Sequence, residues 1–126
     1  MRGLLDTSVV VAHEVAELPD IAAISAATLA ELHFGVHLAR DATARRLRVR
    51  RLTEIEARFD PLPIDASVAR AYGALAHRVV SVGRKPRRRA MDLLIAATAQ
   101  ANGVALYTRD ARELLGLEDE LDIRVV

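Results

Sequence analysis

Short apolar runs alternate with longer amphipathic stretches along the 126 residues of the chain. The short runs have the length of buried strands, and the longer stretches carry apolar residues at helical spacing. The predicted strands are 2–5, 21–24, 104–108 and 122–126, and the predicted helices are 7–13, 25–40, 41–58, 66–82, 88–101 and 110–115. Strands that alternate with helices favour parallel pairing through right-handed crossovers. The pattern therefore predicts an α/β fold, a single domain over 1–126 with a three-layer helix–sheet–helix sandwich around a short, mostly parallel sheet.

Polar residues and breakers mark the ends of these elements. Ser25, Asp41 and Asp65 each precede a helical pattern and are expected to cap it, and Thr7 or Ser8 is expected to cap the first helix. Pro86 suits the first turn of a helix, whereas Asn102-Gly103 and Gly116 mark helix ends. The segment 59–64 contains two prolines and is expected to be a brief edge or connecting strand.

Composition narrows the class of protein without naming a function. Hydrophobic residues make up 52% of the chain and aromatic residues 3%, which suits close-packed helices and short strands. The absence of cysteine excludes disulfides and thiolate metal sites. The opening residues do not resemble a leader peptide, and no apolar run approaches the length of a membrane span. A soluble cytoplasmic protein with no membrane partner is expected.

Four acidic residues stand beside apolar runs, where a lone ionised carboxylate is costly to bury. They are Asp6, Glu31, Asp92 and Asp110. Asp6 and Asp110 follow predicted strands directly, and the ligand site of an open parallel sheet lies outside the carboxyl ends of its strands. A shared divalent cation is the simplest neutraliser, and an oxygen-only set of carboxylates suits Mg²⁺ or Mn²⁺. Such a site performs metal-assisted hydrolysis of phosphodiesters.

Each acid also has a purely structural explanation. Asp110 and Glu113 have the spacing of a capping pair, and Glu31 could form a salt bridge with one of the many arginines. Asp92 could cap its own helix, whereas Asp6 is the hardest to explain as a cap because Thr7 or Ser8 already offers one.

A basic segment precedes Asp92, and its charged members are candidate RNA contacts: Arg84, Lys85, Arg87, Arg88 and Arg89. A nest of carboxylates repels a polyanion unless cations surround it, and this segment supplies cations. A solvated charge run in a loop is the alternative. With few aromatics for base stacking, recognition would depend on phosphate contacts and shape.

The assembled pattern resembles the PIN-domain family, and within it the VapC-type toxins of bacterial toxin–antitoxin pairs. The resemblance spans essentially the whole chain in consistent order, over residues 4–9, 24–36, 71–73, 92–99 and 102–110. It implies a ribonuclease with a Mg²⁺ or Mn²⁺ site at the carboxyl edge of a parallel sheet. It also implies a homodimer and a small antitoxin partner that occupies the acidic cleft.

The resemblance assigns unequal roles to the acids. Asp6 and Asp92 become the primary metal ligands, and Glu31 and Asp110 act directly or through water. Two positions depart from the family pattern: Ser8 stands where an Asn is common, and Asp110 replaces an Asn, with Glu113 as the later acid. We favour Asp110 as the fourth acid. The supporting residues expected to orient the site are Thr7, Ser8, Thr108 and Glu113.

The leading hypothesis is a metal-dependent endoribonuclease that acts as a toxin. One alternative is a phosphatase or phosphotransferase that uses Asp6 as nucleophile. The other is a catalytically silent binding module whose acids serve as caps and ion pairs.

Overall fold

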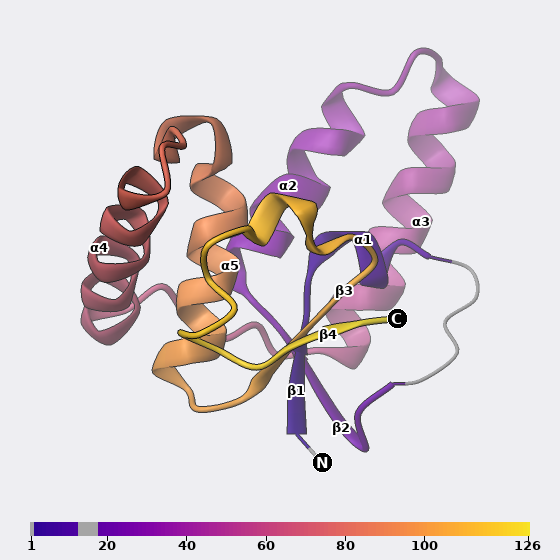
Figure 1. Ribbon diagram of the computed structural model, residues 1–126. Coiled ribbons are helices and arrows are strands. Elements are labelled where there is room, and N and C mark those ends of the chain that lie inside the picture. Colours follow the sequence, from indigo (N-terminus) through magenta and orange to yellow (C-terminus); the bar gives the residue numbers. More distant parts are fainter. Residues whose placement is uncertain (1, 13–17) are drawn as a thin grey trace.

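A four-stranded parallel sheet forms the centre of the protein, in the order β2-β1-β3-β4 (Figure 1). The computed structural model describes residues 2–12 and 18–126. Its strands are β1 (Arg2–Leu5), β2 (Ile21–Ile24), β3 (Ala105–Thr108) and β4 (Ile123–Val125). The predicted α/β class is confirmed. Because β1 and β3 are parallel neighbours, their carboxyl ends meet at the same edge of the sheet.

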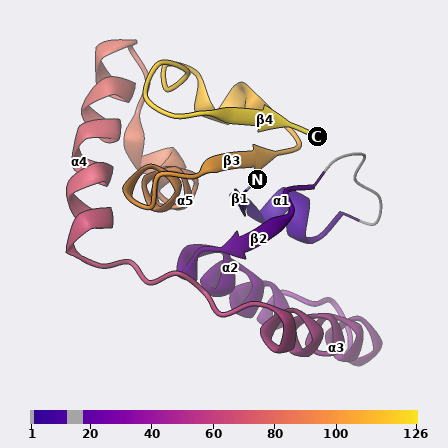
Figure 2. The ribbon, with the colours of Figure 1, turned by 90° about the horizontal axis from the view of Figure 1, so that it is seen from below.

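Helices cover both faces of this sheet (Figures 1 and 2). The α-helices are α1 (Thr7–Val10), α2 (Ala26–His37), α3 (Ala42–Arg58), α4 (Ala66–Ser81) and α5 (Ala90–Ala101). Two 3₁₀ turns, η1 (Pro86–Arg89) and η2 (Ala111–Leu114), precede α5 and follow β3. Helices α4 and α5 lie together on one side of the sheet and α1 lies on the other, while α2 and α3 form a hairpin beside β2 (Figure 2). None of the helices in the described ranges is both long and apolar enough to cross a membrane.

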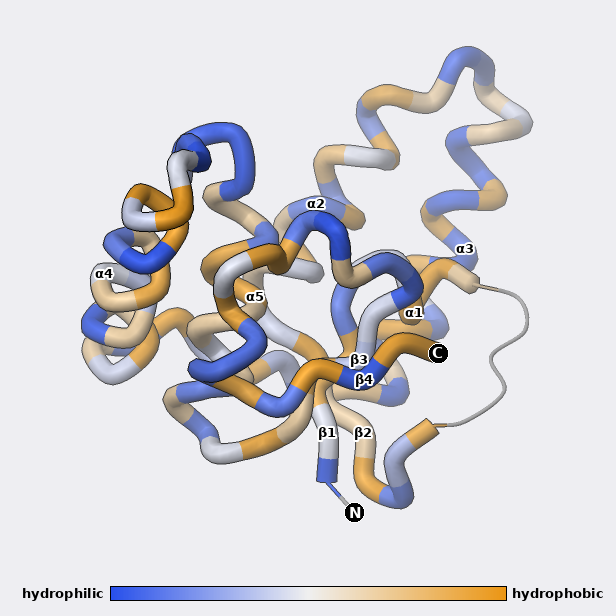
Figure 3. Tube along the Cα trace, in the orientation of Figure 1, coloured by the Kyte–Doolittle hydropathy of each residue, from blue (hydrophilic) through white to orange (hydrophobic). Residues whose placement is uncertain are grey.

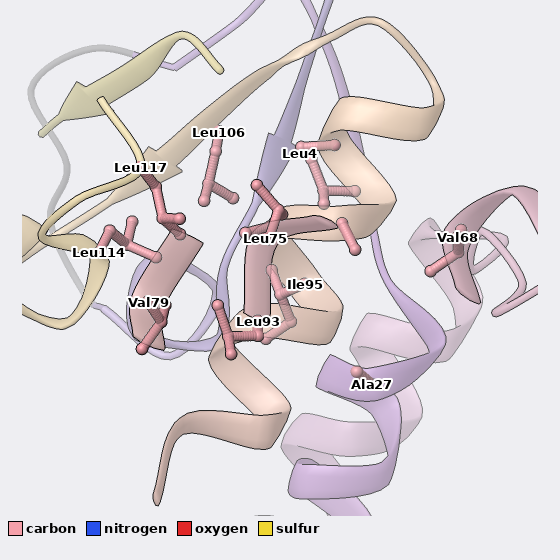
Figure 4. Packing of buried hydrophobic residues seen from close by; sticks show 13 residues of the cluster. Leu4, Ala27, Val68, Leu75, Val79, Leu93, Ile95, Leu106, Leu114 and Leu117 are labelled. Carbon is pink, nitrogen blue, oxygen red and sulfur yellow. The ribbon is translucent and has the colours of Figure 1, made fainter. Parts of the chain in front are cut away.

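Alternate strand residues supply the two hydrophobic clusters, because successive side chains of a strand point to opposite faces. Leu4 and Leu106 are buried in the larger cluster with residues of α4 and α5 such as Leu75 and Leu93 (Figure 4). The next residue of β1, Leu5, belongs to the second cluster. That cluster also contains Val9, Val10, Ile24, Ile55, Ala105 and Tyr107. Each face of the short sheet thus has its own core.

The predicted helix caps are largely confirmed. Ser25, Asp41 and Asp65 each accept a hydrogen bond from a backbone N–H in the first turn of α2, α3 and α4. Gly103 and Gly116 have φ angles of 65° and 94°, a region that favours glycine after a helix or turn. The first predicted helix is shorter than expected: α1 ends at Val10, with Val11 as its C-cap, and only the predicted end at His13 lies outside the described residues.

Three predictions about the elements are wrong. Asp6, rather than Thr7 or Ser8, caps α1. The segment 59–64 is not a strand: Leu62 forms a single bridge to Ser25, because the flanking prolines, Pro61 and Pro63, have no N–H to donate. The helix predicted from 88 begins at Ala90, since residues 86–89 form a 3₁₀ turn.

Candidate active site

Acidic side chains from four parts of the chain line one pocket of about 140 Å³. Asp6 follows β1, Glu31 belongs to α2, Asp92 belongs to the first turn of α5, and the fourth part is the segment of Asp110 and Glu113. The structure therefore brings together all four acids singled out in the sequence, with Glu113 as a fifth. The supporting residues Thr7, Ser8 and Thr108 also line this pocket.

Asp6 is held at the junction of the two central strands. Its backbone N–H donates to the Tyr107 carbonyl at 2.9 Å, which extends the pairing of β1 with β3. Its Oδ1 accepts from the Val9 N–H at 3.2 Å and from the Ser8 hydroxyl at 2.5 Å. The Ser8 hydroxyl in turn accepts from the Arg109 N–H at 3.1 Å. Asp6 thus both caps α1 and lines the pocket. The Ser8 hydroxyl connects the Asp6 carboxylate to the backbone just after β3.

Glu31 is held by a hydroxyl group rather than by an arginine. The Thr7 hydroxyl donates to Glu31 Oε1 at 2.7 Å and lies 3.2 Å from the hydroxyl of Thr28. Within the described residues, no Lys or Arg forms an ion pair with Glu31. The salt-bridge explanation of Glu31 therefore finds no support. Instead, the hydrogen bond from Thr7 fixes the orientation of the Glu31 carboxylate.

Asp92 is the acid with the most perturbed environment. Burial is the main cause that raises its pKa, and the negative charges of Glu31, Glu113 and Asp6 raise it further, whereas Arg89 lowers it. Helix α5 begins without a side-chain cap, so the carboxylate of Asp92 does not serve as one. A half-buried carboxylate surrounded by other carboxylates is typical of a functional site, and here the neighbours come from the end of β1, from α2 and from η2.

Asp110 and Glu113 lie differently in the pocket. Asp110 caps η2 through the Arg112 N–H at 2.9 Å, and the Arg112 guanidinium binds its carboxylate at 2.5–3.0 Å. These hydrogen bonds lower the pKa of Asp110. The charge of Glu113, in contrast, acts on Asp92. These contacts confirm the cap at Asp110, and they show that the charge of Glu113, rather than that of Asp110, acts on Asp92.

Some cationic side chains of the basic segment are exposed to solvent, and others are bonded to residues of η2. It forms the hydrophilic stretch of chain between α4 and α5 (Figure 3). Lys85, Arg87 and Arg88 are exposed. Arg84 donates to the Arg112 carbonyl at 2.9 Å, and Arg89 pairs with Glu113 at 3.6 Å. Three of the five candidate RNA contacts are therefore open to solvent.

The pocket suits a hard divalent cation by its donor chemistry, because its polar lining consists of carboxylate and hydroxyl oxygens. As the side chains lie, the described residues contain no group of three or more acids or histidines that could hold a metal ion. Mg²⁺ uses one or two protein carboxylates and keeps several waters, so Asp6 and Asp92 alone would suffice as direct ligands. Glu31 and the η2 acids would then act through water.

Comparison with known proteins agrees with this geometry. A family model described as PIN domain matches residues 4–115, so the chain belongs to the PIN-domain family. Ribonuclease VapC4 of Mycobacterium tuberculosis is 39% identical over 117 residues, which cover 86% of this chain and 86% of that protein. Ribonuclease VapC5 of the same organism is 37% identical over 114 residues, covering 86% of this chain and 82% of that protein.

Solved structures show the same architecture. VapBC-5 from Mycobacterium tuberculosis, a member of the VapBC family of toxin–antitoxin systems, matches with a TM-score of 0.87 and 34% identity, over 99% of this chain and 98% of that one. FitAcB from Neisseria gonorrhoeae matches with a TM-score of 0.76 and 27% identity, over 97% and 96% of the two chains. The resemblance to VapC-type PIN domains is thereby confirmed.

Proposed function

We propose that the chain is a metal-dependent endoribonuclease that acts as the toxin of a toxin–antitoxin pair. The observation that carries the proposal is the pocket in which Asp6, Glu31 and Asp92 meet from three separate elements. The two Mycobacterium tuberculosis relatives are named as ribonucleases, which supports RNA as the substrate. The Mg²⁺ or Mn²⁺ requirement is inferred from the oxygen-only lining.

The side chains of the pocket have distinct tasks in this reaction. Asp6, fixed by Ser8 and by the N–H of Val9, would bind the ion together with Asp92. A bound ion would supply hydroxide near neutral pH and neutralise the charge that develops on the phosphate. Glu31, turned by Thr7, would orient the attacking water. Residues that hold carboxylates in place spare the site a rearrangement during the reaction.

Purified chain incubated with RNA provides the direct test. Cleavage is expected with Mg²⁺ or Mn²⁺ and is expected to stop in EDTA. Cleavage that persists in EDTA contradicts the metal requirement. A phosphoryl group trapped on Asp6 would indicate phosphotransfer instead, and the absence of both Mn²⁺ binding and cleavage would indicate a binding module.

The three exposed cations of the basic segment are expected to bind RNA phosphates. Replacing Lys85, Arg87 and Arg88 together by Gln should weaken RNA binding and reduce the slope of log affinity against log salt by roughly one for each phosphate that is no longer neutralised. Binding isotherms at several salt concentrations measure this slope. A slope unchanged from the wild type would mean that the segment is only a solvated charge run.

Separate variants of Asp110 and Glu113 identify the fourth acid. Glu113→Gln is expected to slow cleavage by about 10- to 100-fold, the usual cost of losing a residue that supports a metal site. Asp110→Asn is expected to retain most activity, because Asn still caps η2 and the Asp110 carboxylate is already bound by Arg112. Cleavage rates under identical metal concentrations compare the two, and the reverse order would assign the fourth role to Asp110.

The proposed partners follow from the same relationship. VapBC-5 belongs to a toxin–antitoxin system, and we expect this chain to bind a small antitoxin protein and to form a homodimer. An RNA substrate places the expected activity in the cytoplasm. Light scattering of the purified chain, alone and with the product of an adjacent small reading frame, would measure both assemblies.

A further inference from the structure

Arg89 does not face solvent as its sequence neighbours Arg87 and Arg88 do. Its side chain is 16% exposed, whereas Arg87 and Arg88 are exposed residues. Its Nε lies 3.6 Å from Glu113 Oε2, and its Nη1 donates to the Glu113 carbonyl at 3.4 Å. A long cationic side chain normally keeps its charged end in water. The burial of Arg89 beside Glu113, which lines the pocket, therefore indicates a role at the border of the pocket rather than on the RNA surface.

Arg89 also stands close to the most perturbed acid of the pocket. It directly precedes α5, as its N-cap, and stands three residues before Asp92. Its positive charge favours the ionised form of Asp92, against the burial and the charges of Glu31, Glu113 and Asp6. Arg89 thus acts on the same carboxylates that would bind an ion.

The charges of the pocket are otherwise poorly balanced. Asp110 is neutralised by Arg112, which leaves four carboxylates to repel one another. These are Asp6, Glu31, Asp92 and Glu113. The salt bridge from Arg89 brings a positive charge into this set and fixes η2 against the start of α5.

We propose that Arg89 is an internal counter-cation of the acidic pocket. It holds Glu113 beside Asp92 when no ion is bound, and it competes with a divalent ion for these carboxylates. Arg89 is therefore a positioning residue and not an RNA contact. The inference rests on the proposed function, since the competing ion is the one that the nuclease would use.

Titration with Mn²⁺ in the absence of RNA tests the competition. Arg89→Gln is expected to lower the Mn²⁺ dissociation constant about three- to fivefold, the factor that corresponds to a partly exposed ion pair. Arg88→Gln removes the same charge from an exposed neighbour and is the matched control. Its Mn²⁺ dissociation constant is expected to equal that of the wild type within experimental error. Arg89→Lys, which keeps the charge, should bind Mn²⁺ close to the wild-type value. An unchanged or raised constant in folded Arg89→Gln overturns the proposal, because a purely structural arginine would give that result.

Thermal unfolding in EDTA provides a second measurement that needs no ion. Arg89→Gln should lower the unfolding midpoint, and adding Glu113→Gln should recover part of that loss because the unpaired carboxylate is then gone. Strictly additive effects of the two substitutions would overturn the pairing. If the chain does not cleave RNA, the proposed nuclease function is contradicted, but the measured Mn²⁺ dissociation constants and unfolding midpoints still test the role of Arg89. If Arg89→Gln leaves the Mn²⁺ dissociation constant unchanged, the proposed role of Arg89 is contradicted, but the nuclease function is not. A wild-type chain that binds no Mn²⁺ overturns the competition.

Discussion

Replacing Asp92 by Asn is expected to reduce RNA cleavage by more than about 100-fold while leaving the chain folded. Removing a residue that only supports a metal ligand costs up to about 100-fold, so the loss of a direct ligand should exceed this. Asn has nearly the same shape as Asp but binds a hard cation more weakly, because it is uncharged. Cleavage rates at saturating Mn²⁺, with circular dichroism to verify folding, measure the effect. Full activity in this variant would sink the proposed site.

The same substitution should not destabilise the metal-free protein. The pKa of Asp92 is raised in the folded state, chiefly by burial, so its ionised form costs stability. The protonated form contributes stability that is fully present below the ordinary pKa of 3.8 and is lost as the pH rises through the raised folded pKa. Near neutral pH, Asp92→Asn is therefore expected to be as stable as the wild type or more stable in urea unfolding with EDTA. A loss of activity combined with no loss of stability separates a functional acid from a structural one.

Asp6→Asn should reduce RNA cleavage about as much as Asp92→Asn does, although Asp6 also has a structural role. Asp6 caps α1, and Asn is about as good a cap as Asp, so the local fold should persist. Asp6→Ala also removes the cap and should cost about 1 kcal/mol in addition. Comparing the two variants by urea unfolding distinguishes the cap from the ligand role of Asp6.

Local chemistry explains which parts of this fold could be predicted from the sequence. Asp41 and Asp65 cap their helices as expected, because a helix cap depends only on a polar side chain and the backbone N–H groups within the next few residues. The parallel sheet follows from the alternation of strands and helices. Asp6 and Glu31 could be selected as site residues because each stands in an apolar setting, although the selection of Asp6 rests partly on a wrong expectation, since it also caps α1.

The remaining features depend on contacts between distant segments. Leu62 forms only one bridge because prolines flank it and Ser25 happens to face it. Arg89 looks identical to Arg87 and Arg88 in the sequence, and only the position of η2 turns it toward Glu113. The hydrogen bonds between Arg112 and Asp110 are local in the sequence. Whether Asp110 or Glu113 is the fourth acid, however, depends on which of them acts on the distant Asp92. Such assignments require the packed structure because they are made across 20 or more residues, as in the 24-residue separation of Arg89 from Glu113.

Acidification is expected to remove the metal ion from this site at a higher pH than an ordinary carboxylate would allow. A metal ligand must be deprotonated, so protons and Mn²⁺ would compete for Asp92 if it binds the ion as proposed. Since burial and the neighbouring acids raise the pKa of Asp92, this competition begins above the ordinary value of 3.8. Below the raised pKa, the Mn²⁺ affinity should fall about tenfold for each pH unit if one proton is displaced.

Calorimetric titration with Mn²⁺ from neutral to mildly acidic pH measures this dependence, and cleavage should fall in parallel at limiting metal. Asp92→Asn is the matched control, because its residual Mn²⁺ binding should lose the component that titrates with Asp92. An affinity that stays level across the range in which Asp92 becomes protonated would show that Asp92 does not bind the ion. Saturating Mn²⁺ should restore cleavage at the lower pH, since an excess of the ion displaces the proton, whereas protonation of a group needed only for proton transfer would not be overcome by metal.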